Sequence, residues 1–154
     1  MAQPTTASVS TDVAAPPDAV YALVADVRNM GRWSPECRSC EWVDEPGVVG
    51  SHFKGRNRNG PMRWTTTARV LAADPGQEFS FATVAGDKLS TRWTYRFEPA
   101  GGGTTLTESF ESIYTPPMIA LFERLFMRNR QAQLEDGMRR TVAAIKAAAE
   151  ATAG

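Results

Sequence analysis

Residues 90–114 carry the pattern that most strongly indicates the fold of this 154-residue chain, and they read STRWTYRFEPAGGGTTLTESFESIY. It holds two runs in which apolar and polar residues alternate, 90–98 and 104–114, separated by the Gly-rich segment 99–103. Alternation with a period of two is the pattern of a half-buried strand, and a short Gly-rich link joins antiparallel neighbours. The stretch therefore predicts two paired strands with one apolar face.

Four further strands are predicted ahead of this pair, at residues 40–43, 52–58, 63–72 and 78–84. Turn sequences such as Glu45-Pro-Gly47 and Asp74-Pro-Gly76 separate them. Repeated short strands with short turns indicate an antiparallel meander rather than βαβ units.

The segment before these strands predicts one more strand and two short helices. Residues 9–15 alternate mildly and end at Pro16-Pro17, where a helix can begin because its first N–H groups are unpaired anyway. We expect that helix over residues 18–26, followed by a second short helix or turn before the extended residues Trp33-Ser-Pro35.

The segment after Pro117 is predicted to be helical to the end of the chain. Residues 118–127 are apolar around most of the helix, so they should be covered on several sides or else contact a ligand or partner. The later part carries a narrow apolar stripe, which consists of Leu134, Met138, Val142 and Ile145.

These elements give an α+β fold class, with a curved antiparallel sheet of about seven strands wrapped around a long C-terminal helix. The sheet must bury one face, and this helix is the only large amphipathic element available to cover it. One helix does not fill the whole concavity. We therefore expect a cavity between helix and sheet that holds a hydrophobic small molecule.

Composition narrows the function further. The chain has 17 lysines and arginines and 17 aspartates and glutamates. The net charge is therefore zero, and no overall positive electrostatic field attracts nucleic acid. No secretion signal and no apolar run of about 18 residues occurs, so we expect a cytoplasmic protein without membrane insertion. The length fits a single domain over residues 1–154, with its main body at about 6–150.

Common catalytic and cofactor motifs are missing from the sequence. His52 is the only histidine and no G-x-S-x-G occurs, which argues against a hydrolase triad. The sequence contains neither G-x-x-x-x-G-K-S/T nor G-x-G-x-x-G, the Gly-rich motifs that bind nucleotide phosphates. No cofactor is therefore expected.

Cys37 and Cys40 form a C-x-x-C that leads into a predicted strand. A redox motif of this spacing is expected at a helix N-terminus, where the dipole lowers the thiol pKa. His52 and Glu36 can add zinc ligands, but no second C-x-x-C or H-x-x-x-H completes a site. We therefore expect no metal, and two half-buried thiols are the simpler interpretation.

Six local motifs spread over nearly the whole chain point to one family: APPDAVYALVAD at 15–26, MGRWSPEC at 30–37, FKGRN at 53–57, PGQEF at 75–79, WTYRFEP at 93–99 and GTTLTE at 103–108. Together they resemble the SRPBCC superfamily of START and birch-pollen-allergen-like proteins, in its polyketide cyclase/dehydrase branch. The resemblance implies a helix-grip fold with a deep cavity for lipids, sterols, hormones or aromatic polyketides. Only some members of the superfamily are enzymes.

Strand alternation assigns the candidate site residues to faces. On the last strand Leu106, Glu108 and Phe110 share one side, which we expect to face the helix. Asn57 and Tyr95 can each hydrogen-bond a ligand. Alternatively, Asn57 is a turn residue and Tyr95 is a core aromatic residue whose hydroxyl bonds to the backbone. The predicted cavity lining is Trp33, Phe53, Asn57, Trp64, Thr66, Phe79, Phe81, Trp93, Tyr95, Glu108 and Phe110, with Phe122 and Phe126 closing the cavity from the helix.

Glu108 is the most informative of these residues. A carboxyl in an apolar site has a raised pKa, which suits an acid or base that deprotonates carbon next to a ketone. Tyr95 is its candidate catalytic partner. Alternatively, Glu108 pairs structurally with an arginine such as Arg63, Arg69 or Arg92, or lies at a solvated cavity mouth.

Three hypotheses for function follow. The first is a binding protein for a lipid-like or aromatic polyketide metabolite, which needs only an apolar pocket with one or two orienting groups. The second is a polyketide cyclase, aromatase or dehydratase that uses Glu108 in the same cavity. The third is an interaction module or homodimer through the apolar residues 118–127.

Overall fold

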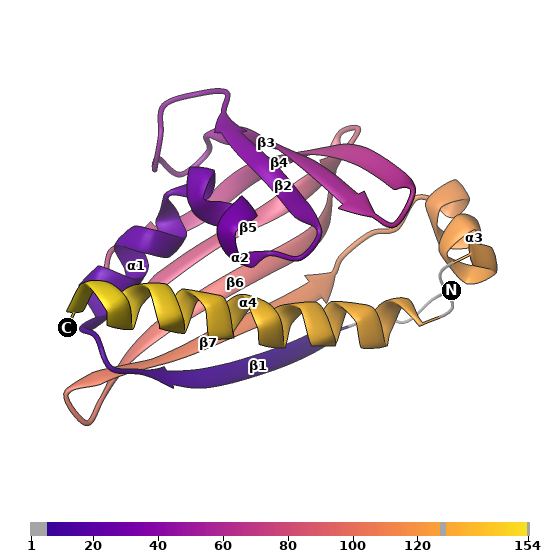
Figure 1. The fold of residues 1–154 in the computed structure, drawn as a ribbon. Coiled ribbons are helices and arrows are strands. Elements are labelled where there is room, and N and C mark those ends of the chain that lie inside the picture. The colour runs from indigo at the N-terminus through magenta and orange to yellow at the C-terminus, as the bar shows by residue number, and fades with distance from the viewer. Residues whose placement is uncertain (1–5, 127–128, 154) are drawn as a thin grey trace.

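The computed structural model of the chain describes residues 6–126 and 129–153. Seven strands form one sheet, with short helices between the first two strands and two helices after the last (Figure 1). In chain order the elements are β1 (Thr6–Val13), α1 (Pro17–Ala25), the 3-10 turn η1 (Val27–Asn29), α2 (Met30–Trp33), β2 (Cys37–Trp42), β3 (His52–Asn59), β4 (Met62–Asp74), β5 (Glu78–Ala85), β6 (Lys88–Ala100), β7 (Gly103–Ser112), α3 (Pro117–Phe126) and α4 (Arg130–Ala153).

The sheet runs in the order β1-β7-β6-β5-β4-β3-β2, and every neighbouring pair is antiparallel. The predicted strand pair at 90–98 and 104–114 is β6 with β7, whose register places Tyr95 opposite Glu108. The predicted turn at Asp74-Pro-Gly76 joins β4 to β5, and Gly76 has a φ of 73°, which glycine adopts without the strain of a Cβ. The predicted α+β class with an antiparallel meander is confirmed.

Helix α4 lies across the sheet beside β1, as Figure 1 shows. Its buried face includes Met138, Val142 and Ile145, three members of the predicted stripe. The fourth member, Leu134, is half-buried and faces the cavity described below.

Helix α1 covers a separate part of the core. Its Tyr21 packs edge-on against Phe79 and Phe97, with ring centroids 6.3 and 5.4 Å apart. Phe79 and Phe97 are almost completely excluded from solvent. The sheet therefore has a tightly packed region under α1, and the cavity lies in the other part of its inner face.

The C-terminal segment differs from the single helix that the sequence predicted, because α3 and α4 are separate helices. At 100° per residue, Met127 continues the α4 stripe backwards, but the polar Glu123 and Gln131 also fall within it. Phe122 and Leu125 would fall on the opposite side of such a helix. One continuous helix would therefore not bury both sets of apolar residues.

Helix α3 lies at one end of the molecule, away from the sheet (Figure 1). The sequence predicted that its apolar residues would be covered or would contact a ligand or partner, and in this structure they are exposed. Met118 is 84% exposed, and Ile119, Leu121 and Leu125 are each more than half exposed. Binding of a second copy to this face stays a prediction. No helix in the described residues has the length and apolarity needed to cross a membrane.

Candidate functional site

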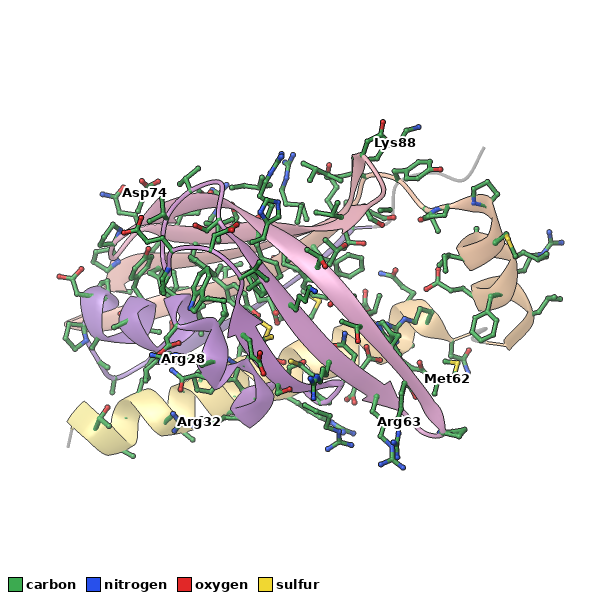
Figure 2. The ribbon with its side chains drawn as sticks, turned by 90° about the horizontal axis from the view of Figure 1, so that it is seen from above. Arg28, Arg32, Met62, Arg63, Asp74 and Lys88 are labelled. Carbon is green, nitrogen blue, oxygen red and sulfur yellow. The ribbon has the colours of Figure 1, made fainter. Side chains whose placement is uncertain are left out.

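A cavity of about 540 Å³ lies between α4 and the inner face of β3 to β7. One side is formed by α2 and β2, and the mouth lies between the β3–β4 hairpin and the start of α4, where Asn59 and Gln133 both line it. In Figure 2, Met62 and Arg63 mark the tip of this hairpin. A cavity of this volume is within the range that holds small organic ligands, roughly 300–1,000 Å³.

Glu108 and Tyr95 form a buried pair in the wall of the cavity. They are opposite each other on β7 and β6, and the Tyr95 hydroxyl donates a hydrogen bond of 2.5 Å to Oε2 of Glu108. Only 2% of Glu108 and 3% of Tyr95 is exposed. The other carboxyl oxygen, Oε1 of Glu108, has no hydrogen-bond partner among the described residues.

The electrostatics of this pair follow from its burial. Removal from water raises the pKa of Glu108 to about 8, although the Tyr95 hydrogen bond acts in the opposite direction. Burial and the neighbouring carboxyl also raise the pKa of Tyr95 well above its ordinary value, so the phenol keeps its proton. Among the described residues none of the ion pairs includes Glu108.

The rest of the inner wall is largely aromatic. Phe53 and Phe81 meet edge to face with centroids 5.0 Å apart, and the half-buried Trp64 and Trp93 also line the cavity. The polar side chains of Asn57 and Thr66 interrupt this wall, and Nδ2 of Asn57 donates a hydrogen bond of 3.2 Å to Oγ1 of Thr66. These predicted residues therefore surround one space together with the Tyr95–Glu108 pair.

The other predicted site residues lie elsewhere. Phe79 belongs to the core under α1, and Trp33 is buried at the end of α2 outside the cavity lining. Phe110 is opposite Trp93 on the same face of the sheet but outside the cavity lining, and the two ring centroids are 5.3 Å apart. Phe122 is on α3 and 39% exposed, and the side chain of Phe126 lies outside the described residues.

Several lining residues were not predicted from the sequence. Met138 and Thr141 of α4 are buried and face the cavity, as does Met30 beside β2. Cys37 and Cys40, which were predicted to be ordinary half-buried thiols, are both buried in the cavity wall. The stripe on the last helix marks Met138 in the sequence, whereas the C-x-x-C spacing does not show that both thiols lie on the cavity side of a strand.

A polar cluster closes part of the cavity mouth. Arg130 at the start of α4 donates two hydrogen bonds to Glu36, one of them 2.9 Å from Nη2 to Oε1, and Asn59 donates to the same carboxylate over 3.0 Å. The Arg130 guanidinium also lies 3.7 Å from Glu123 and over the ring of Trp64. This cluster joins α4 to the segment before β2 and to the end of β3.

Arg130→Gln should lower the free energy of unfolding by about 1–3 kcal/mol, because it removes a charged two-bond contact to a partly buried carboxylate. Arg130 and Glu36 keep only 20% and 27% of their side-chain area exposed. Urea denaturation measures the difference. Arg140→Gln is the matched control, since its pair with Asp136 is on the surface of the same helix and should change stability by less than about 0.5 kcal/mol. Equal effects of the two variants would contradict a special role for Arg130.

A curved antiparallel sheet that holds one long helix over a cavity defines the class of helix-grip proteins. Within that class, the chain belongs to the family described as polyketide cyclase/dehydrase and lipid transport, whose match covers residues 4–150. The predicted fold and the predicted SRPBCC membership are thereby confirmed.

Solved structures with the same fold include proteins at very different identities. The Polyketide_cyc-like protein Cgl2372 from Corynebacterium glutamicum is 36% identical, with 95% of this chain and 91% of that chain covered at a TM-score of 0.65. Comparison with curated proteins finds no match.

Two more distant structures show likeness of fold alone. The di-domain ARO/CYC StfQ from the steffimycin biosynthetic pathway has a TM-score of 0.76 at 17% identity, covering 98% of this chain and 52% of that chain. Ara h 8.0201 has a TM-score of 0.63 at 13% identity, with coverage of 96% and 98%.

Proposed function

We propose that this protein binds a hydrophobic, aromatic or lipid-like small molecule whose single polar group hydrogen-bonds to Glu108. The proposal rests on a cavity that aromatic side chains line on the sheet side and that holds one buried carboxyl, of which one oxygen has no partner among the described residues. A buried polar atom without a partner costs about 1–3 kcal/mol, and a ligand group can remove that cost.

The protonation state of Glu108 sets the kind of polar group that fits. With a pKa of about 8, the carboxyl is mostly protonated at neutral pH and donates a hydrogen bond, which suits a ligand carbonyl or hydroxyl oxygen. The Tyr95 hydroxyl holds the other carboxyl oxygen. The ligand therefore meets one oriented donor beside the aromatic side chains of the wall.

A matched pair of ligands tests this proposal. Naphthol should bind about tenfold more tightly than methylnaphthalene, which has a similar size but no hydroxyl group, because one net hydrogen bond contributes about 1.4 kcal/mol. Tryptophan fluorescence titration measures both affinities, since Trp64 and Trp93 line the cavity. Glu108→Met should lose the preference and still bind methylnaphthalene. Equal affinities in the parent protein, or an unchanged preference in the variant, would overturn the role of Glu108.

A cyclase or dehydratase activity is the second candidate, and the Tyr95–Glu108 pair is the observation that favours it. An acid with a pKa of about 8 can exchange a proton with the carbon between two ketones near neutral pH. Incubation with a poly-β-ketone thioester, followed by mass spectrometry, should then yield a product smaller by one water. Glu108→Gln should stop the reaction. If the thioester is recovered unchanged in the presence of the parent protein, the cavity only binds.

A further inference from the structure

The two cysteines of the C-x-x-C lie in contact on the cavity side of β2. Their Sγ atoms are 3.4 Å apart, and Cys37 and Cys40 are 5% and 6% exposed. In a regular strand, residues three apart point to opposite faces. The pairing of β2 with β3 shifts register between Cys37 and Ser39, and this bulge turns both thiols to the same face.

The same bulge brings the two cysteines closer along the strand. Their partners on β3 are Asn57 and Gly55, which are two residues apart, so the Cα atoms of the cysteines are separated by about 6.6–6.8 Å. Disulfides span Cα separations of roughly 4.4–6.8 Å. A bond between the two sulfurs is therefore within reach, at the upper edge of the range.

Access to the thiols is through the cavity, because both side chains are buried and both line it. Met30 is the next sulfur neighbour, at 3.9 Å from Sγ of Cys40. No group of three His, Cys, Asp or Glu able to hold a metal ion occurs in the described part of the chain. The surroundings therefore favour chemistry between the two sulfurs over metal binding.

We propose that Cys37 and Cys40 are a redox-active dithiol that a small uncharged disulfide oxidises from inside the ligand cavity, and that a bound ligand shields it. The Cys37 thiol loses its proton to solvent, and its sulfur attacks one sulfur of the reagent, forming a mixed disulfide and releasing one thiolate. Cys40 then loses its proton to that thiolate and attacks the Cys37 sulfur, which expels the second reagent thiolate. Two protein thiols are oxidised by two electrons, and one reagent disulfide is reduced to two thiols.

The electrostatics agree with this order of events. The hydrogen bond from Cys40 lowers the pKa of Cys37, so the Cys37 thiolate is favoured as the attacking group. The same contact and burial raise the pKa of Cys40 well above its ordinary value, so Cys40 reacts second.

Reaction of the reduced protein with dipyridyl disulfide tests the dithiol. The parent protein should release two pyridinethiones per chain and end without an adduct, lighter by the mass of two hydrogens. Cys37→Ser and Cys40→Ser should each release one pyridinethione and keep a pyridylthio adduct, with circular dichroism checking their folding. A parent protein that ends with two adducts, or that reacts only after unfolding in urea, overturns the proposal.

A second arm tests shielding, which rests on the proposed ligand binding. Naphthol at about ten times its Kd should slow the reaction about tenfold, because it lowers the fraction of empty cavity by that factor. An unchanged rate, with naphthol binding seen by tryptophan fluorescence, overturns shielding. Absence of naphthol binding contradicts the proposed function, whereas the mass measurement without ligand still decides whether the two thiols form a disulfide.

Discussion

Glu108→Gln should make the protein more stable than its parent by about 5 kcal/mol at pH values above 8, with almost no difference below pH 4.5. The pKa of Glu108 is about 8 in the folded protein, against 4.5 as its ordinary value. Between these values the folded state binds more protons than the unfolded state, so the free energy of unfolding falls as pH rises. The contribution of protonated Glu108 to stability is fully present below pH 4.5. It falls by about 1.4 kcal/mol per pH unit as the pH rises from 4.5, and it is lost once the pH has passed 8.

Urea denaturation of both proteins at a series of pH values measures this difference. Subtracting one curve from the other removes the other titrating groups, which the two proteins share. Glu111→Gln is the matched control, because Glu111 is an exposed carboxylate on the same strand. A parent-minus-variant difference that is flat from pH 4 to 9 would mean that Glu108 is hydrated and ionised, and that it does not serve as a donor to a ligand.

Thr141→Phe should weaken binding of naphthol about 100-fold by filling the cavity. Thr141 is buried in the middle of α4 and faces the cavity, and its hydroxyl donates a hydrogen bond of 2.8 Å to the carbonyl of Gly137 in its own helix. A phenyl ring at this position takes up space that the ligand needs. A 100-fold loss corresponds to about 2.7 kcal/mol.

Thr141→Val is the control for this substitution, because it keeps the size of the side chain and removes only the hydroxyl group. Fluorescence titration should give this variant nearly the parent affinity. Thermal unfolding of Thr141→Phe should show a small change, since the ring enters empty space rather than a packed core, where overpacking costs about 1–3 kcal/mol. Undiminished naphthol binding by Thr141→Phe would place the ligand elsewhere.

Alternation alone predicted much of this site. It assigned Glu108 and Tyr95 to inner faces of neighbouring strands, and it placed Phe53 and Phe81 with them; all four line the cavity. The predicted faces agree with the structure here because a slip of one residue in β5, β6 or β7 would reverse every side chain of the strand. It cannot show that α1 fills one end of the sheet, which places Phe79 in packed core.

Other features depend on tertiary contacts that no local pattern encodes. The bulge in β2 breaks the period of two, so the sequence predicted neither the common face of Cys37 and Cys40 nor their contact. The Arg130–Glu36 pair joins residues 94 positions apart. The break between α3 and α4 is visible in the sequence only as a change in helical phase between residues 118–127 and the later stripe.

Native mass spectrometry of the purified protein, followed by extraction and identification of any bound molecule, tests whether the cavity holds a small molecule. We expect one hydrophobic molecule with one polar group to be bound to each chain, and naphthol should displace it. Thr141→Phe should be purified without it. A parent protein that is free of any ligand and that also binds neither naphthol nor methylnaphthalene would contradict the claim that this cavity holds a small molecule.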